Sequence, residues 1–134
     1  MKQVMILGCG MVGTTMALDL AADPALQVTV ADVRPMALAA LSARAKVKTI
    51  QADLSDPAAI IALVRPFDLV IGALSSSMGL ATLRAVIDAG KPYVDISFMA
   101  DDALTLSPAA AAAGVVAVVD CGIAPGMSNM MAGY

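Results

Sequence analysis

Short apolar runs alternate with helical patterns along the chain. Runs of strand length occupy 4–7, 27–31, 47–51, 67–71, 92–96 and 115–119. Between them, apolar residues recur at helical spacing in 12–22, 35–45, 57–64, 78–89 and 101–113. Strands separated by helical crossovers predict a doubly wound parallel α/β sheet. We expect about six strands in the order 3-2-1-4-5-6.

Polar residues and glycines mark the ends of the predicted helices. Ser55 or Asp56 can cap the helix over 57–64, and Ser77 can cap the one that follows the fourth strand. Gly90 and Gly114 stand where a left-handed residue commonly closes a helix.

The first strand leads directly into the sequence G-C-G-M-V-G at 8–13. Gly8 would allow a tight turn, Gly10 would let a pyrophosphate approach the backbone, and Gly13 would let the helix pack closely on the strand. The amides around Met11 and Val12, at the positive end of the helix dipole, would hold the phosphates. A strand before this motif and a helix after it predict a Rossmann-type dinucleotide site. A glycine-rich turn without a ligand is the alternative.

An acid ends the second predicted strand. Asp32 stands nineteen positions after Gly13, where a carboxylate can accept hydrogen bonds from a ribose diol. A cap on the next helix is the alternative role for Asp32. Arg34 could meet the 2′-phosphate of NADP, but Asp32 would repel that phosphate. The sequence therefore favours NAD, with NADP as the second candidate.

In a sheet of this order, the carboxyl ends of all strands meet at one edge. Besides the glycine turn and Asp32, that edge gathers Asp53, Ala73, Leu74, Asp95, Asp120, Cys121 and Gly122. Asp53 could face the adenine or serve in a turn. Asp95 and Asp120 are weak catalytic candidates near the expected nicotinamide, with structural turn roles as the alternative. Because the edge is acidic, amide dipoles would have to hold the cofactor phosphates.

Composition excludes several classes of site. The chain has 134 residues, a net charge of −3 and no histidine, and its acids are all aspartates. One domain is expected, with no His-based catalysis and no metal site. The basic residues are scattered, so no nucleic-acid groove is predicted. Cys9 and Cys121 are expected as free thiols.

The apolar content of 60% raises the question of a membrane segment. The longest clean apolar run, 109–119, is much shorter than the roughly 20 residues that a spanning helix needs. Buried parallel strands and alanine-rich helices explain the content better. The sequence around Cys9 imitates a lipoprotein cleavage site, but the apolar run before it is too short for a signal peptide. We therefore expect a cytoplasmic protein without membrane contact.

Two segments carry a resemblance to a known family. The sequences G-I-A-P-G-M-S-N at 122–129 and K-P-Y-V-D-I-S at 91–97 resemble segments of saccharopine dehydrogenase-like proteins. The resemblance covers the entire chain and is strongest to the lysine 6-dehydrogenase branch. It implies an NAD(P)-dependent oxidoreductase that acts on the C–N bond of an amino acid or polyamine through an imine. It also implies that Gly122, Pro125 and Gly126 form a bend toward the nicotinamide pocket.

Family members continue into a second domain that binds the substrate and forms dimer contacts. The resemblance thus implies a dinucleotide-binding domain over 1–122 and, over 123–134, the start of a connection to a substrate domain outside this chain. The chain alone would then be inactive, with a small amino acid as substrate and a homodimer expected only for the longer form. A nucleotide-sensing module of the potassium-transporter type and a non-catalytic scaffold are the alternatives, and the segment at 122–129 favours the enzyme.

Overall fold

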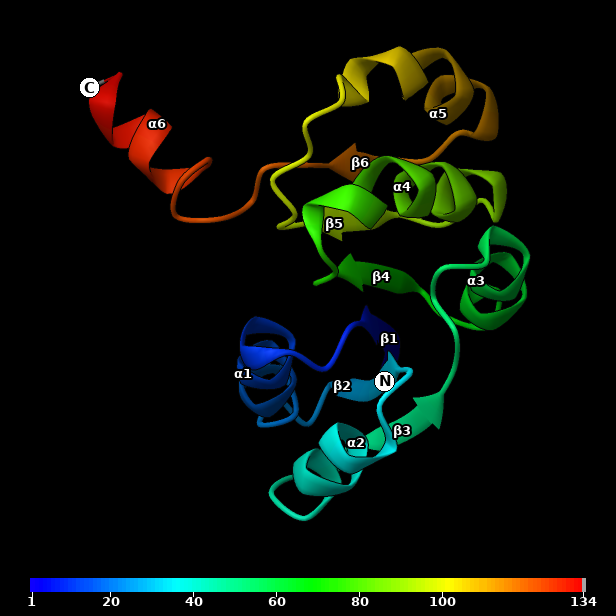
Figure 1. Cartoon of the computed structure of the whole chain (residues 1–134), viewed down its shortest axis with the longest axis vertical. Coiled ribbons are helices and arrows are strands. Elements are labelled where there is room, and N and C mark those ends of the chain that lie inside the picture. Colours follow the sequence, from blue (N-terminus) through cyan, green and yellow to red (C-terminus); the bar gives the residue numbers. More distant parts are fainter. Residues whose placement is uncertain (134) are drawn as a thin grey trace.

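Six parallel strands form one sheet in the order β3-β2-β1-β4-β5-β6 (Figure 1). The computed structural model describes residues 1–133. The strands are β1 (Lys2–Leu7), β2 (Leu26–Asp32), β3 (Lys48–Gln51), β4 (Leu69–Gly72), β5 (Tyr93–Asp95) and β6 (Ala117–Val118). The predicted fold class and strand order are confirmed.

Helices cover both faces of the sheet. They are α1 (Met11–Leu20), α2 (Pro35–Ser42), α3 (Pro57–Val64), α4 (Gly79–Asp88) and α5 (Ser107–Ala113), with 3₁₀ turns η1 (Ser76–Met78) and η2 (Ala103–Leu106). A further helix, α6 (Met127–Ala132), follows the sheet. The helices α1 and α2 pack on one face, and α3, α4 and α5 pack on the other (Figure 1). None of the helices in residues 1–133 is long and apolar enough to cross a bilayer.

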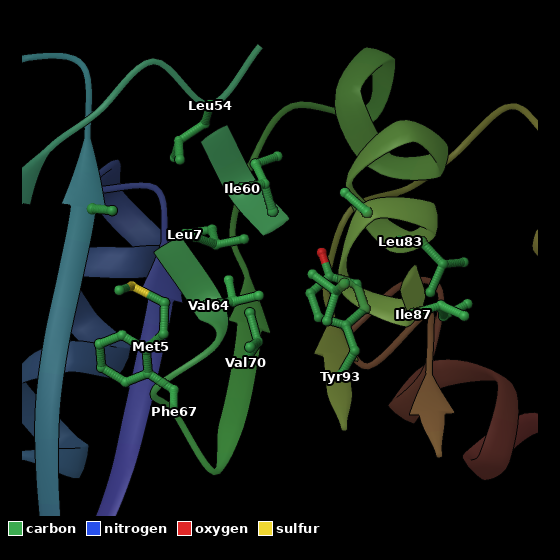
Figure 2. Packing of buried hydrophobic residues seen from close by; sticks show 13 residues of the cluster. Met5, Leu7, Leu54, Ile60, Val64, Phe67, Val70, Leu83, Ile87 and Tyr93 are labelled. Carbon is green, nitrogen blue, oxygen red and sulfur yellow. The ribbon is translucent and has the colours of Figure 1, made fainter. Parts of the chain in front are cut away.

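The central strand β1 contributes to both cores, because its side chains alternate between the two faces. Val4 and Ile6 join the core beneath α1 and α2. Met5 and Leu7 join the opposite core, where Figure 2 shows side chains from α3 and α4, such as Ile60, pointing toward the sheet. Burial on both faces explains why the strands read as continuous apolar runs. It also fixes the end of β1, from which the glycine turn begins.

Most predicted helix ends are confirmed. The Asp56 carboxylate caps α3 by accepting a hydrogen bond from the Ala58 amide at 2.9 Å. Gly90 and Gly114 have the left-handed φ angles of +69° and +65°. The prediction that Ser77 caps a helix is wrong, because the chain enters α4 through η1. Backbone hydrogen bonds of that turn, rather than a serine hydroxyl, begin the helix.

The segment after β6 leaves the sheet. It leads to α6, which stands away from the rest of the fold (Figure 1). Several large apolar side chains of this segment are exposed: Ile123, Met127, Met130 and Met131. The domain boundary near residue 122 stays a prediction, and Tyr134 lies outside the described residues.

Candidate functional site

Packing within the chain explains two of the three motif glycines. Gly8 has a φ of +108°, and a Cβ there would lie 2.5 Å from the carbonyl oxygen of Ala73 at the end of β4. A Cβ on Gly13 would collide with the carbonyl oxygen of Gly8. These two positions therefore hold α1 against β1 and β4, as the sequence predicts.

Gly10 has no such explanation within the chain. Its φ is −79°, which any residue can adopt, and no chain atom lies within 4 Å of a Cβ built there. Among the described glycines it is the only one with both properties. It stands directly before α1, so it offers no side chain to cap the first amides of that helix. Met11 and Val12 follow with exposed side chains. The free space thus adjoins the first turn of α1, whose initial amides have no acceptor within the helix.

Asp32 is the centre of a hydrogen-bond network at the end of β2. Its Oδ2 accepts from the Cys9 amide at 2.7 Å and from Arg34 Nη2 at 3.1 Å. Its Oδ1 accepts from the Arg34 amide at 2.8 Å and from Arg34 Nε at 3.0 Å. Four donors therefore occupy a carboxylate that has about four acceptor positions. In this arrangement no acceptor position is left for a ribose hydroxyl.

The network also fixes the charge of Asp32. The residue is only 6% exposed, and this burial by itself would raise its pKa. Hydrogen bonds from the Arg34 side chain and from the Cys9 and Arg34 amides outweigh burial and lower the pKa to about 2. Asp32 is therefore ionised at neutral pH and paired with Arg34. The Arg34 side chain stays 59% exposed, and its Nη2 also donates to the Cys9 carbonyl at 3.1 Å.

Two hollows adjoin the pair of Asp32 and Arg34. We call the first the arginine hollow; it is lined by Cys9, Gly10, Met11, Thr14, Thr15, Arg34 and Arg44. The second, the Asp53 hollow, is lined by Asp32, Val33, Asp53, Leu54, Ser55, Leu74 and Met78. The first combines a glycine turn with two guanidinium groups. The second combines apolar walls with a few polar groups, which suits a flat heterocycle.

Three further predicted contacts, Asp53, Ala73 and Leu74, lie at this part of the edge. Asp53 and Leu74 line the Asp53 hollow, while the Ala73 amide donates to the Leu7 carbonyl at 2.8 Å. Asp53 also accepts from the hydroxyl and the amide of Ser55, at 2.7 and 2.9 Å, and these bonds lower its pKa. Asp53 thus takes part in a local turn, and its contact with an adenine stays a prediction.

Asp95 does not reach the surface. It is 1% exposed and accepts hydrogen bonds from the Tyr93 hydroxyl at 3.0 Å, the Ser97 amide at 3.2 Å and the Ser97 hydroxyl. Burial raises the pKa of Asp95, and burial together with this carboxylate raises the pKa of Tyr93. The geometry favours the structural alternative for Asp95, since its oxygens hold the end of β5.

The remaining predicted residues follow β6. Asp120 is exposed and has a φ of +57°, and the next amide, that of Cys121, donates to the Asp95 carbonyl at 3.0 Å. Burial raises the pKa of the Cys121 thiol. The Gly122 amide donates to the Pro125 carbonyl at 3.1 Å, and Gly126 follows with a φ of +128°. The expected bend is therefore present, and its relation to a nicotinamide stays a prediction.

The sequence did not reveal every residue of the two hollows. Arg44, Thr14 and Thr15 line the arginine hollow, and Ser55 and Met78 line the Asp53 hollow. The only signal for Arg44 was a basic residue just beyond α2, a common feature of helix ends. Its proximity to the glycine turn depends on where α1 and α2 pack on β2, which the sequence pattern does not give.

Comparison with known proteins agrees with this geometry. Residues 4–118 match the sequence profile of the family described as Saccharopine dehydrogenase NADP binding domain. The chain is 32% identical over 132 residues to saccharopine dehydrogenase [NADP(+), L-glutamate-forming] of Pyricularia oryzae, covering 98% of this chain and 29% of that protein. It is 28% identical over 86 residues to alpha-aminoadipic semialdehyde synthase of Arabidopsis thaliana, covering 64% of this chain and 8% of that protein.

Solved structures give the same result. Saccharopine dehydrogenase (L-Glu forming) from Saccharomyces cerevisiae superposes with a TM-score of 0.88 at 26% identity, over 98% of this chain and 30% of that one. Biliverdin reductase from Synechocystis, solved with biliverdin and NADP+, has a TM-score of 0.71 at 22% identity and covers 87% of this chain and 37% of that one. The latter match shows a shared fold. The chain spans less than a third of the length of the curated relatives it matches.

Proposed function

Because the chain belongs to the family of saccharopine dehydrogenase NADP-binding domains, we propose that it binds NADP(H) in an oxidoreductase acting on the C–N bond of an amino acid. Of the three functions that the sequence left open, this family membership selects the dehydrogenase. NAD(P) binding and an oxidoreductase family follow from it directly. The preferred cofactor and the substrate are parts of the proposal.

The observation that supports the binding site most strongly is the free space at Gly10. Neither its backbone angle nor its surroundings require a glycine, and the missing side chain leaves room for a bound group at this position. A pyrophosphate fits this position because the first amides of α1 are free to donate to it. The apolar walls of the Asp53 hollow, formed in part by Leu54, Leu74 and Met78, suit the adenine of the same molecule.

The preference for NADP rests on the pairing of Asp32 with Arg34. The sequence favours NAD because a free aspartate would accept from a ribose and repel a 2′-phosphate. In the structure Arg34 neutralises that carboxylate and occupies its acceptor positions. The exposed part of the guanidinium borders the arginine hollow, where it can donate to a phosphate. The pair therefore favours a phosphate over a bare ribose diol.

When bound, the nicotinamide supplies the hydride acceptor or donor for oxidation or reduction of a C–N bond. The residues of this chain would fix the position of the cofactor. The glycine turn and Arg34 would hold its phosphates, and the carboxyl ends of β4 and β5 form the part of the sheet edge toward the expected nicotinamide. We assign the binding of the amino-acid substrate, and any pairing of two copies, to parts of the enzyme with no counterpart in these 134 residues. The Pyricularia oryzae relative supports this assignment, since the match covers 29% of its length.

The binding site is tested by measuring the dissociation constant of NADPH for the wild-type protein and for Gly10→Val, using the fluorescence of the bound nucleotide. A valine side chain would occupy the free space, so the affinity should fall at least about tenfold. Ala112→Val, at an exposed position of α5 across the sheet, is the matched control and should bind like wild type. Equal affinities of Gly10→Val and wild type would contradict the proposed site.

A further inference from the structure

Arg44 lies in the arginine hollow although it is ten positions away from Arg34 in the sequence. It follows the last residue of α2 by two positions, and its amide donates to the Leu41 carbonyl at 2.9 Å in the closing turn of that helix. Both α1 and α2 pack on β2, and this shared support brings Arg44 to the same hollow as Gly10 and Thr15. The hollow is therefore bordered by one guanidinium from each end of α2.

The two guanidinium groups differ in their partners. Arg34 is paired with the Asp32 carboxylate, so the two charges cancel. In the part of the chain that the structure describes, the side chain of Arg44 makes neither an ion pair nor a hydrogen bond. Arg44 is also exposed, and no acidic residue lines the arginine hollow. The uncompensated positive charge of the hollow therefore comes from Arg44, in a chain whose net charge is −3.

A phosphate monoester such as the 2′-phosphate of NADP carries a charge of about −1.5 to −2 at neutral pH. Arg34 can donate hydrogen bonds to it, but the neutral pair of Arg34 and Asp32 attracts the dianion weakly. A second cation that is not already paired supplies the missing attraction. We propose that Arg44 is a second ligand of the 2′-phosphate and the residue on which selection of NADP over NAD chiefly depends.

The location favours the 2′-phosphate over the pyrophosphate. The ribose that carries the 2′-phosphate lies beside the end of β2 in this fold, and Arg34 follows that strand. The pyrophosphate is instead assigned to the amides at the start of α1. Because NAD and NADP share the pyrophosphate, an arginine that bound it would not distinguish the two. This inference rests on the proposed function, and its test separates the two phosphate groups.

The test measures dissociation constants of Arg44→Ala and wild type for NADPH and NADH by fluorescence, and for 2′,5′-ADP and 5′-AMP by calorimetry. We expect Arg44→Ala to bind NADPH and 2′,5′-ADP about tenfold or more weakly, which is typical for loss of a charged hydrogen bond. NADH and 5′-AMP should bind within about twofold of wild type, since they lack the 2′-phosphate.

Two further variants serve as controls. Arg65→Ala removes an exposed arginine that follows α3 on the opposite face of the sheet, and it should leave every affinity unchanged. Arg44→Lys keeps the charge and should recover part of the NADPH affinity. Added salt should weaken NADPH binding more in wild type than in Arg44→Ala, because salt screens the interaction that the variant lacks.

An equal loss for NADPH and NADH would place Arg44 on a shared part of the cofactor and overturn the inference. Unchanged NADPH affinity in Arg44→Ala would overturn it as well. In both cases wild type still binds NADPH, so the proposed function stands. If wild type binds neither dinucleotide, the proposed function fails and this inference fails with it.

Discussion

Arg34 donates to both carboxylate oxygens of Asp32, with Nε 3.0 Å from Oδ1 and Nη2 3.1 Å from Oδ2. Through the same Asp32 carboxylate, the end of β2 is joined to the Cys9 amide in the glycine turn. This pair therefore has two roles. It braces the glycine turn of the proposed dinucleotide site, and it neutralises the carboxylate that would otherwise face a ribose.

The pair should make stability depend on pH in the acid range. The pKa of Asp32 falls from 3.8 to about 2 on folding. The contribution of Asp32 to the free energy of unfolding is therefore complete above the pKa of the unfolded chain and is lost as pH falls through the pKa of the folded chain. The contribution is about 2 kcal/mol. Urea unfolding should show wild type more stable than Asp32→Asn by up to this amount at pH 7, with the difference shrinking toward pH 2.

Asp95 provides an internal contrast for this measurement. Burial raises its pKa, so its contribution to stability is largest at low pH and decreases as pH rises above the unfolded value. Asp32 and Asp95 thus make opposing contributions to the pH dependence of the free energy of unfolding. The difference between wild type and Asp32→Asn isolates the contribution of Asp32. A difference between wild type and Asp32→Asn that stays constant from pH 7 to pH 3 would contradict the assigned pairing.

Arg34 should contribute to the choice of cofactor beside Arg44. Arg34→Ala removes a donor to the 2′-phosphate and frees the Asp32 carboxylate for a ribose diol. The ratio of NADPH to NADH affinity should therefore fall by about tenfold or more. Fluorescence titration of both dinucleotides measures this ratio, with Arg84→Ala as a control outside the hollows. An unchanged ratio would show that Arg34 only braces the turn.

The fold could be predicted from the sequence because local signals and burial agree. Apolar runs mark strands buried on both faces, and Gly90 and Gly114 end helices at positive φ, as expected. The prediction for Ser77 is wrong because a serine before a helical pattern indicates a cap whether or not a 3₁₀ turn intervenes. Such a turn depends on backbone hydrogen bonds that side-chain periodicity does not record.

The site was less predictable than the fold. Spacing along the chain placed Asp32 near a ribose and Asp95 near a nicotinamide, but it did not show their hydrogen-bond partners. Arg34 occupies the first carboxylate, and Tyr93 and Ser97 enclose the second. Arg44 joins the site because α1 and α2 both pack on β2. These relationships arise from tertiary contacts, which a single sequence does not specify.

The glycines of the turn should separate stability from binding. Gly13→Ala places a Cβ against the Gly8 carbonyl oxygen and should lower the free energy of unfolding by about 1–3 kcal/mol. Gly10→Ala meets no chain atom, so it should change that free energy by less than about 1 kcal/mol. Urea denaturation of both variants tests the contrast. Equal destabilisation would mean that Gly10 is also required by the chain itself.

Tyr93→Phe should destabilise the end of β5. The change keeps the buried ring but removes one of the hydrogen-bond donors to the buried Asp95 carboxylate. We expect a loss of about 1–3 kcal/mol in the free energy of unfolding. The loss should be larger at pH 8 than at pH 4, because the hydrogen bond from Tyr93 is stronger to an ionised Asp95 carboxylate than to a protonated one. Urea denaturation at the two pH values measures it, and a loss independent of pH would contradict this role of Tyr93.

The 134-residue chain should bind the cofactor but should not oxidise saccharopine or lysine. Hydride transfer requires a substrate carbon held about 3–3.5 Å from the nicotinamide, and much of the rate gain comes from that positioning. The sequence has no histidine, and the strand ends carry aspartates such as Asp53 and Asp120, which would repel a substrate carboxylate. The charge of Arg34 is already paired with Asp32.

The assay incubates the chain at high concentration with NADP+ or NAD+ and either substrate, and follows absorbance of the reduced nicotinamide. NADPH titration of the same sample is the control that the binding site is folded. Bound cofactor without turnover is the expected result, because the proposed site positions only the dinucleotide, and Arg34 and Arg44 are both assigned to its phosphate rather than to a substrate carboxylate. Sustained turnover would show that these residues contain a complete active site, and the exposed Asp120 at the end of the sixth strand would then be the first candidate to mutate.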